Sequence, residues 1–295
     1  MRPDFFIVDV FAERAYAGNP LAVVLGAERL SDETMQLLAA ETNYSDTTFV
    51  YSAAEANGGY RTRLFTPARE IAFAGHPILG TAWVIEKYIP GARRDGVKLN
   101  LQVGAIPVYF EPDGNGAETL WFDAPPIAAG LQCDSARMAA ALGLATDDID
   151  RRYPVQVMSA GTAAAIVPLR SRAALQRALL DLTAYAGLMA EGFPPLTYLF
   201  CTEARSPDND LSARFFFEAH GVREDPATGN GAAFLAKYLR MYEVYPPERR
   251  SWRIEQGLEV RRPSLVQIRI GSGAEPAIQV GGGVCAAIQG NLIPA

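Results

Sequence analysis

The chain has 295 residues, of which 49% are hydrophobic and 20% are charged, and its formal net charge is −6. The length suits two domains of ordinary size, each with its own core. The acidic balance and the lack of a long basic run argue against a nucleic-acid partner, and no apolar run approaches the length of a membrane span.

The cysteines and the N-terminus indicate an intracellular setting. Cys133, Cys201 and Cys285 are widely spaced, and neither paired-cysteine nor histidine-rich metal spacing occurs. The first residues read as a strand with acidic side chains, which is not the pattern of a signal peptide. We therefore expect a cytoplasmic protein with buried cysteines and no metal site.

In chain order, the first half combines short β-rich runs with two helical segments. Ser31 is the expected N-cap of a helix over about 32–41, because acidic residues follow it. A second, apolar helical run follows Gly75-His76-Pro77 and ends near Tyr88. Strands are expected around 8–11, 18–24, 47–51, 60–65, 98–102, 106–111 and 119–122.

The second half has the same mixture of strands and helices. A helix is expected at 134–142, ended by Gly143, and a helical stretch at 171–189 is interrupted near Asp181. An alanine-rich helix follows Thr228-Gly229-Asn230. Strands are expected around 155–157, 161–167, 196–202, 214–218, 252–255, 265–270 and 277–280. Regular α/β alternation is absent, so a doubly wound parallel fold is not expected.

The order of elements is similar in the two halves. A strand-like run, a glycine-containing turn and a helix occur around Gly75, where the helix is apolar, and again around Gly229, where it is alanine-rich. This indicates an internal repeat: an α+β fold of two similar domains, each a mostly antiparallel sheet wrapped around a central helix. We expect domains at 1–125 and 126–280, and the segment 281–295 is a candidate to return to the first domain.

Polar groups occur at four turn-rich places in this pattern, and they make a candidate active site. The titratable members, Asp46, His76 and Asp225, are the expected catalytic residues. Helix starts attract anions through their free N–H groups, so two starts facing one inter-domain cleft would bind a carboxylate-bearing substrate. The expected substrate-binding residues are Asn19, Ser45, Gly75, Thr228, Gly229, Asn230 and Gly231.

The three titratable groups also have ordinary structural interpretations. His76, one of two histidines, can equally be a surface or capping residue, and Asp46 an N-cap or turn residue. Asp225 before Pro226 can be only a turn. If Asp46 is desolvated, its ionised form is disfavoured, and such a carboxyl group can take a proton from one carbon and return it to another.

Ordered blocks along almost the whole chain resemble the phenazine-biosynthesis F-like (PhzF-like) isomerases, which share the diaminopimelate epimerase fold. The matching blocks are 8–11 with 18–23, 43–49, 65–70 with 73–77, 224–229, 255–257 and 262–264. The resemblance implies proton transfer between carbons of a small carboxylate-bearing substrate without metal or organic cofactor. It also implies an active site between the domains and often a homodimer.

The resemblance assigns a role to each titratable residue. Asp46 stands where the family has its acid/base glutamate, and it is one methylene shorter. The proton carrier would therefore sit about one carbon–carbon bond further back, and catalytic geometry tolerates little error. His76 would orient or assist the proton transfer, and Asp225 would position substrate or catalytic partners. Asn230 replaces a serine that is frequent in the family.

Two alternatives stay open. Diaminopimelate epimerase-like racemases use two cysteines at the helix starts, but here those starts are Ala74-Gly75-His76 and Thr228-Gly229-Asn230, with all three cysteines elsewhere. A catalytically impaired family member that acts as a small-molecule-binding or scaffold protein is the second alternative, because Asp46 replaces the glutamate. The sequence does not name the substrate, nor whether the product is a double-bond isomer, a tautomer or an epimer.

Overall fold

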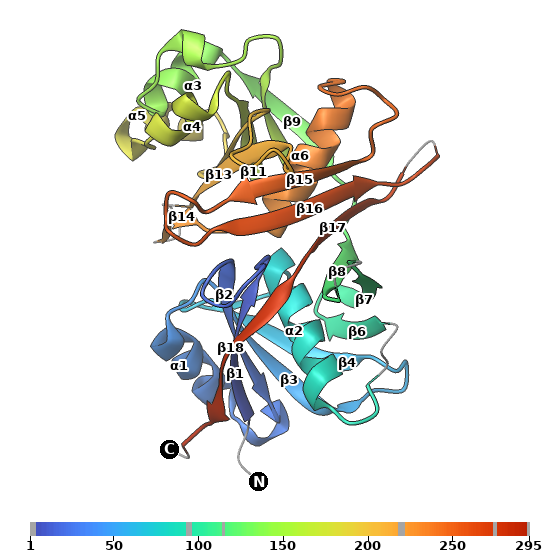
Figure 1. The fold of residues 1–295 in the computed structure, drawn as a ribbon. Helices are drawn as coiled ribbons and strands as arrows, with labels where there is room; N and C mark the ends of the chain where they lie inside the picture. Colours follow the sequence, from blue (N-terminus) through green and yellow to red (C-terminus); the bar gives the residue numbers. More distant parts are fainter. Residues whose placement is uncertain (1–3, 93–95, 114–115, 218–221, 274–275, 294–295) are drawn as a thin grey trace. The chain divides into compact units, whose positions relative to one another are not determined.

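The chain folds into two compact units in the computed structural model, which describes residues 4–92, 96–113, 116–217, 222–273 and 276–293 (Figure 1). Unit 1 comprises Met1–Asp123 with Gly281–Ala295, and unit 2 comprises Ala124–Val280. Each unit combines one β-sheet with a few helices, which confirms the α+β class. The second histidine, His220, lies outside the described residues.

The sheet of unit 1 is mostly antiparallel, with parallel pairs only at β2–β3 and β4–β6 among the pairings described. Its strands, in order of pairing, are β18 (Val284–Asn291), β1 (Asp4–Val10), β2 (Asn19–Leu25), β3 (Thr47–Ala54), β4 (Tyr60–Phe65), β6 (Gly96–Leu101), β7 (Gly104–Pro112) and β8 (Glu118–Asp123). A two-residue strand, β5 (Glu70–Ile71), adds to β4. The last part of the chain thus completes the sheet begun by the first.

One helix forms the centre of unit 1. Helix α2 (Gly75–Tyr88) is buried along most of its length and contacts β1 and β2. Gly80 permits this close packing, because a Cβ there would lie 2.7 Å from the side chain of Leu21. The peripheral α1 (Asp32–Thr42) follows the short η1 (Ala27–Arg29), and Ser31 accepts the Thr34 N–H at 3.1 Å as the expected N-cap.

The sheet of unit 2 repeats this pairing scheme, with parallel pairs at β11–β12 and β13–β15. Its paired strands are β9 (Ala128–Cys133), β10 (Val155–Ala160), β11 (Thr162–Pro168), β12 (Thr197–Cys201), β13 (Leu211–Phe217), β15 (Ser251–Gln256) and β16 (Ser264–Ile270), with β14 (Val222–Asp225) on β13. The chain changes unit within β17 (Ile278–Gly282). The shared scheme confirms the expected internal repeat.

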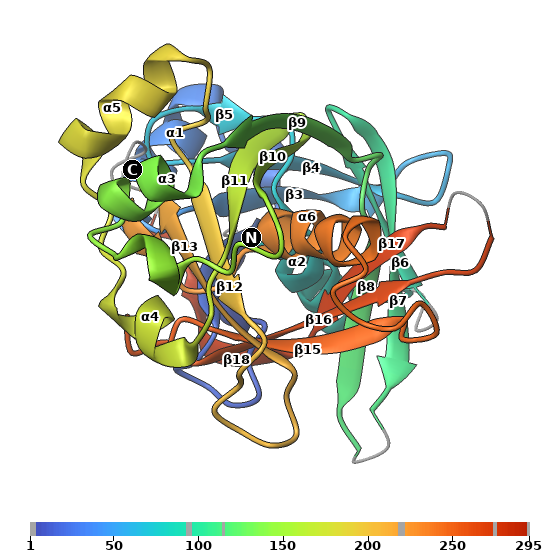
Figure 2. The ribbon, with the colours of Figure 1, turned by 90° about the horizontal axis from the view of Figure 1, so that it is seen from above.

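The helices of unit 2 lie on both sides of its sheet. Helix α6 (Gly229–Met241) is the buried central helix, whereas α3 (Ser135–Ala141), α4 (Arg172–Arg177) and α5 (Leu182–Ala190) lie across β11–β13 from it (Figures 1 and 2). The short η2 (Thr146–Asp148) follows α3. Asp181 caps α5 by accepting the Thr183 N–H at 2.8 Å, which explains the expected interruption of the helical stretch.

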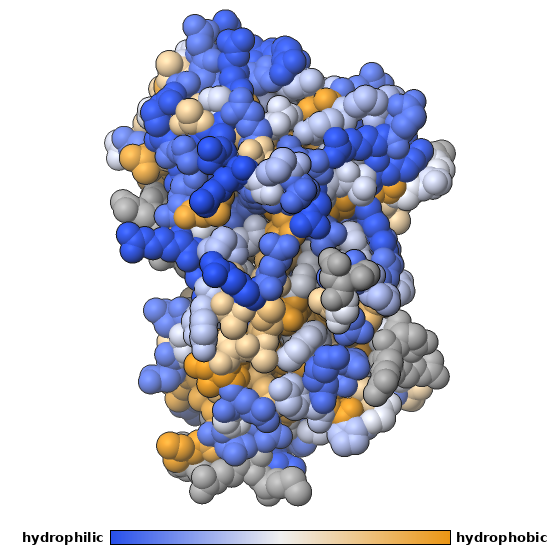
Figure 3. Space-filling view, in the orientation of Figure 1, coloured by the Kyte–Doolittle hydropathy of each residue, from blue (hydrophilic) through white to orange (hydrophobic). Residues whose placement is uncertain are grey.

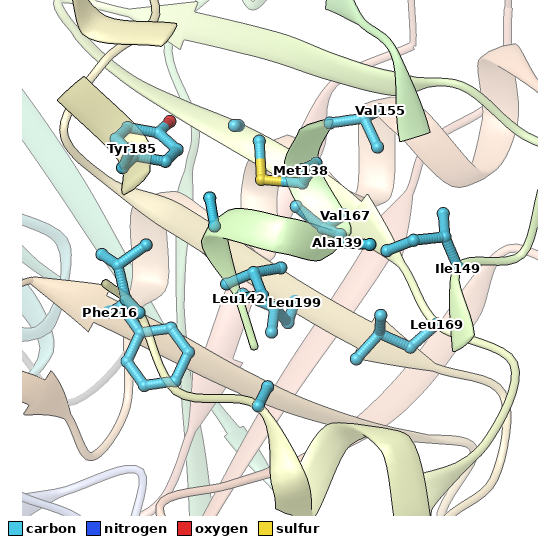
Figure 4. Close-up of a cluster of buried hydrophobic side chains, with 14 of the residues drawn as sticks. Met138, Ala139, Leu142, Ile149, Val155, Val167, Leu169, Tyr185, Leu199 and Phe216 are labelled. Carbon is cyan, nitrogen blue, oxygen red and sulfur yellow. The ribbon is translucent and has the colours of Figure 1, made fainter. Parts of the chain in front are cut away.

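A cluster of apolar side chains attaches α3 and α5 to the sheet of unit 2 (Figure 4). Met138 of α3 and Leu142, the C-cap residue of that helix, lie with Leu199 and Phe216 from the strands, and all four are at most 2% exposed. Tyr185 closes the cluster from α5, and its buried hydroxyl donates to the Pro194 carbonyl at 2.7 Å. Replacing such a leucine by alanine costs about 2–5 kcal/mol, so this cluster carries much of the stability of unit 2.

Two kinds of expectation were wrong. The strands β5, β9, β14 and β18 were not foreseen, and β9 is exposed over nearly its whole length, so it lacks the alternating apolar pattern. Of the three cysteines expected to be buried, only Cys201 is. Cys133 and Cys285 are partly exposed, because they lie on the largely exposed strands β9 and β18. All three are free thiols.

The surface of the described residues was compared with what a membrane span or a metal site would require. In Figure 3 the surface over α3–α5 is mostly polar. The exposed large hydrophobic side chains of unit 1 include Leu37, Ile288 and Ile293. No helix within the described ranges has the length and apolar character needed to cross a membrane. In the same ranges, no three His, Cys, Asp or Glu residues gather as a metal site would require.

Candidate functional site

Asp46 lies in the short connection between α1 and β3. Asn43 ends α1 in the left-handed conformation (φ 52°, ψ 29°), and β3 begins at Thr47. The hydroxyl groups of Thr42 and Thr47 hydrogen bond at 2.9 Å across this connection, which fixes its shape. Asp46 is 7% exposed, so its carboxyl group is largely removed from water.

His76 is the second residue of α2, and the structure brings it to Asp46. Its Nδ1 atom lies 3.6 Å from the Asp46 Oδ2 atom, and the residue is 5% exposed. The N-cap residue Ala74 is extended and has no side chain that could accept a hydrogen bond from the helix start. The first turn of α2 therefore begins at Gly75 without a side-chain cap, which is the arrangement that favours an anion.

Burial sets the charge of the imidazole. Desolvation lowers the pKa of His76 to about 3, so the ring is neutral near pH 7. The 3.6 Å approach to Asp46 is therefore not an ion pair at that pH, although its length would fit one. A neutral ring that turns its Nδ1–H toward the carboxylate keeps a lone pair on Nε2.

Two polar atoms beside the Asp46–His76 pair have no hydrogen-bond partner among the described residues. They are the His76 Nε2 atom and the Ser45 Oγ atom, and both are buried. Buried polar atoms are normally satisfied, and an exception calls for an explanation such as a functional role. An acceptor nitrogen and a hydroxyl group in this state are suited to bind a polar group of a ligand.

Asn19 is another expected substrate-binding residue of unit 1. It is the first residue of β2 and is 1% exposed. The preceding Gly18 has φ 68°, and a Cβ there would lie 2.8 Å from that of Ala12. The loop before it is held by Asp9, whose carboxylate accepts the Tyr16 N–H at 2.6 Å. Asn19 is thus placed by a rigid turn.

In unit 2, Asp225 is the last residue of β14 and is 8% exposed. The Thr228 hydroxyl donates to its Oδ2 atom at 2.5 Å. Thr228 is also the N-cap residue of α6, but its side chain makes no capping hydrogen bond to the helix start. Asn230 donates to the Thr162 hydroxyl at 3.5 Å from the first turn of α6.

Gly231 is required by packing in that same turn. A Cβ at this position would overlap the Tyr198 ring, which is fully buried beneath α6. Gly229 opens the helix and is itself buried. The start of α6 is therefore held close against β12. The side chain of Thr228 leaves the backbone N–H groups of its first turn without a cap.

Sequence reasoning missed one polar residue of this region. Gln256 at the end of β15 is 1% exposed, and its carboxamide donates to the Asp225 carbonyl at 2.9 Å. The only signal for it was its place in the block Glu255-Gln256-Gly257. The structure thus groups Asp46 with His76 in unit 1, and Asp225 with Thr228 and Gln256 in unit 2. The common cleft expected from the sequence stays a prediction.

Comparisons with known proteins agree on the family. The sequence model of the phenazine biosynthesis-like proteins (PhzC-PhzF) matches residues 8–290. The trans-2,3-dihydro-3-hydroxyanthranilate isomerase of Pseudomonas aeruginosa is 33% identical to this chain over 297 residues, which cover 97% of this chain and 98% of the relative.

Solved structures agree on the fold. A PhzF-family phenazine biosynthesis protein of Bacillus anthracis matches with a TM-score of 0.91 at 22% identity, covering 100% of both chains. A probable proline racemase of Agrobacterium radiobacter matches with a TM-score of 0.63 at 11% identity, covering 99% of this chain and 93% of the other, so the similarity extends to epimerase-like folds. The chain belongs to the phenazine biosynthesis-like family and is a PhzF-like isomerase.

Proposed function

We propose that this isomerase moves a proton between two carbons of a small carboxylate-bearing substrate, with its own side chains as acid and base. The observation that carries the proposal is the buried Asp46 carboxyl group 3.6 Å from a neutral imidazole. The name of the Pseudomonas aeruginosa relative gives the substrate class: a hydroxylated, partly saturated anthranilate. Such a molecule carries a carboxylate beside ring carbons between which a proton can move.

In this mechanism Asp46 is the proton carrier. Its carboxylate takes a proton from one carbon, and the resulting carboxylic acid returns it to another. His76 stays neutral because of its burial, so its Nδ1 atom faces the Asp46 carboxyl group at 3.6 Å and its Nε2 lone pair accepts from a polar group of the substrate. A low dielectric around both groups strengthens these interactions at the moment of transfer.

The substrate carboxylate is assigned to the uncapped helix starts. The backbone N–H groups at the starts of α2 and α6 are donors of the kind that bind anions, and neither N-cap side chain occupies them. Asp225, held by Thr228, would then orient an amino or hydroxyl group of the substrate. If the residues of both units act on one substrate, the fold-loss in turnover of the double variant Asp46→Asn with Asp225→Asn will differ from the product of the two single fold-losses.

Transfer of deuterium tests the mechanism. The substrate trans-2,3-dihydro-3-hydroxyanthranilate would be incubated with the protein in D₂O, and label position and turnover followed by NMR. We expect Asp46→Asn to lower turnover by about 10²–10⁴-fold while the affinity measured by calorimetry is kept. Glu33→Gln, at an exposed acidic position in α1, is the matched control. Turnover that is indifferent to replacement of both Asp46 and His76 would refute the assignment.

The second candidate function is ligand binding without catalysis, and the shorter side chain of Asp46 is the observation that favours it. Asp46→Glu separates the two. A weakened isomerase gains rate when the longer carboxylate restores the reach of the proton carrier. A binding protein binds the anthranilate derivative but gives no turnover, either with Asp46 or with glutamate at that position.

The assembly and the location of the protein are part of the same proposal. We expect a homodimer, as the resemblance to the family implies, and a cytoplasmic location, as the cysteines and the N-terminal residues indicate. Sedimentation velocity at several protein concentrations measures the first, and cell fractionation measures the second.

A further inference from the structure

The carboxamide of Gln256 supports the turn that joins β14 to α6. Its Nε2 atom donates to the Asp225 carbonyl at 2.9 Å and to the Thr228 hydroxyl at 3.2 Å. Its Oε1 atom accepts the Thr228 N–H at 3.3 Å and the Tyr198 hydroxyl at 3.3 Å. One buried side chain therefore contacts both ends of the turn.

Two of these partners fix the orientation of the amide. A backbone carbonyl can only accept and a backbone N–H can only donate, so Nε2 must face Asp225 and Oε1 must face the Thr228 N–H. The Tyr198 hydroxyl fits this assignment, because burial and then the Asp225 charge raise its pKa and keep it a donor. The flip ambiguity usual for glutamine is thereby removed.

The orientation of the amide decides the direction of the next hydrogen bond. The Thr228 hydroxyl oxygen accepts from Gln256, and its own proton is then directed at the Asp225 Oδ2 atom. Because an ionised carboxylate offers only acceptors, the hydroxyl must donate to it. The result is a one-way chain of donors that runs from Gln256 through Thr228 to the Asp225 carboxylate.

The backbone around Gln256 is rigid on both sides. Gly257 has φ 78°, and a Cβ there would lie 2.5 Å from the Pro226 carbonyl oxygen, so the end of β15 packs directly on the turn. The preceding Glu255 carboxylate accepts the N–H groups of Arg205 and Ser206 at 2.7 and 2.8 Å. These contacts hold the strand end that presents the carboxamide.

We propose that Gln256 is a positioning residue, which orients the Thr228 hydroxyl and through it the Asp225 carboxylate toward the substrate. This inference rests on the proposed function, in which Asp225 binds a polar group of the substrate. Gln256 has no contact with reacting atoms in this scheme. Its effect passes through Thr228, and this separates it from a residue that only stabilises the fold.

A double-mutant cycle tests this path. Gln256→Met keeps the length of the side chain and removes its donor and acceptor, and Gln267→Met on the neighbouring β16 is the control. We expect Gln256→Met to lower kcat/KM by about tenfold to a hundredfold, because the Thr228 hydroxyl then loses the donor that directs its own hydrogen bond at the charged Asp225 carboxylate. Gln267→Met should leave kcat/KM unchanged. Thr228→Val should give a similar loss, and the double variant should lose no more than the worse single variant.

Losses that multiply in the double variant would overturn the proposal, because Gln256 would then act without Thr228. Should Gln256→Met fail to fold, Gln256→Leu takes its place: it is likewise uncharged and lacks the donor, so the same loss is expected.

A crystal structure of the variant separates this inference from the proposed function. If the wild-type protein shows no turnover, the proposed function fails, but the position of Asp225 can still be determined. We expect its carboxylate in Gln256→Met to leave the Thr228 hydroxyl. An Asp225 side chain that keeps its hydrogen bond to Thr228 in that variant would overturn the positioning role.

Discussion

The burial of His76 couples the stability of the protein to pH. The imidazole has a pKa of 6.5 in an exposed chain, and burial lowers it to about 3 in the folded protein. Below pH 6.5 the unfolded chain therefore binds a proton that the folded chain does not. The stabilisation from this group is complete above about pH 6.5 and is lost progressively as the pH falls toward about 3.

The size of the effect follows from the difference between the two pKa values. While only the unfolded imidazole is protonated, the free energy of unfolding falls by about 1.4 kcal/mol per pH unit. Between about pH 7.5 and pH 5 the loss from His76 alone amounts to about 2 kcal/mol. This window lies above the usual pKa values of carboxyl groups, so the other large titrations contribute little within it.

Urea denaturation at half-unit pH steps measures this loss in the wild-type protein, in His76→Gln and in His220→Gln. The chain has two histidines, so the two variants account for all imidazole titration. We expect the difference in the free energy of unfolding between wild type and His76→Gln to shrink by about 2 kcal/mol over the window. A difference that is flat with pH would show that His76 titrates normally, and the neutral imidazole of the proposed mechanism would then be wrong.

Two stability predictions concern unit 2. Gly231→Ala should destabilise the protein by about 1–3 kcal/mol, because its Cβ would overlap the Tyr198 ring. Gly187→Ala, at an exposed position of α5, should instead stabilise it by up to about 1 kcal/mol. Thermal unfolding measures both, and equal shifts would contradict the packing argument. Glu224→Gln should lower the free energy of unfolding by about 3–5 kcal/mol, because it leaves Arg214 without the carboxylate that it binds at 2.7 Å in a buried pair. Urea denaturation measures this, and a loss under about 1 kcal/mol would refute it.

The sequence predicted the elements whose residues carry their own local signal. The capping residue Ser31 marked the start of α1 correctly, because its side chain bonds to the nearby backbone. The interruption expected near Asp181 is also present, and there the structure adds that Asp181 is the N-cap of α5. The strand β9 could not be foreseen in the same way. Its side chains are exposed, and it is a strand only because β10, more than twenty residues later, supplies hydrogen bonds to it.

The candidate site shows the same limit. Asp46 and His76 were found from their residue types and from the turns around them, and the structure adds that burial makes the imidazole neutral. Gln256 could not be found from local pattern, since its partners Asp225 and Thr228 lie far back in the chain. Its role depends on a parallel pairing of β13 and β15 that no local periodicity records.

The internal repeat explains why two similar units can serve two different purposes. The shared pairing scheme gives each unit a buried central helix whose start carries no side-chain cap, at Gly75 in α2 and at Gly229 in α6. The side chains beside these starts are not repeated. Unit 1 places a neutral imidazole next to a carboxyl group, a pair able to move a proton. Unit 2 instead holds its carboxylate in a chain of hydrogen bonds from Gln256 and Thr228, which suits a group that must keep one position. The proposed division between proton transfer and substrate positioning thus rests on what differs between the units, while their common fold supplies the uncapped helix starts to which the proposal assigns the substrate carboxylate.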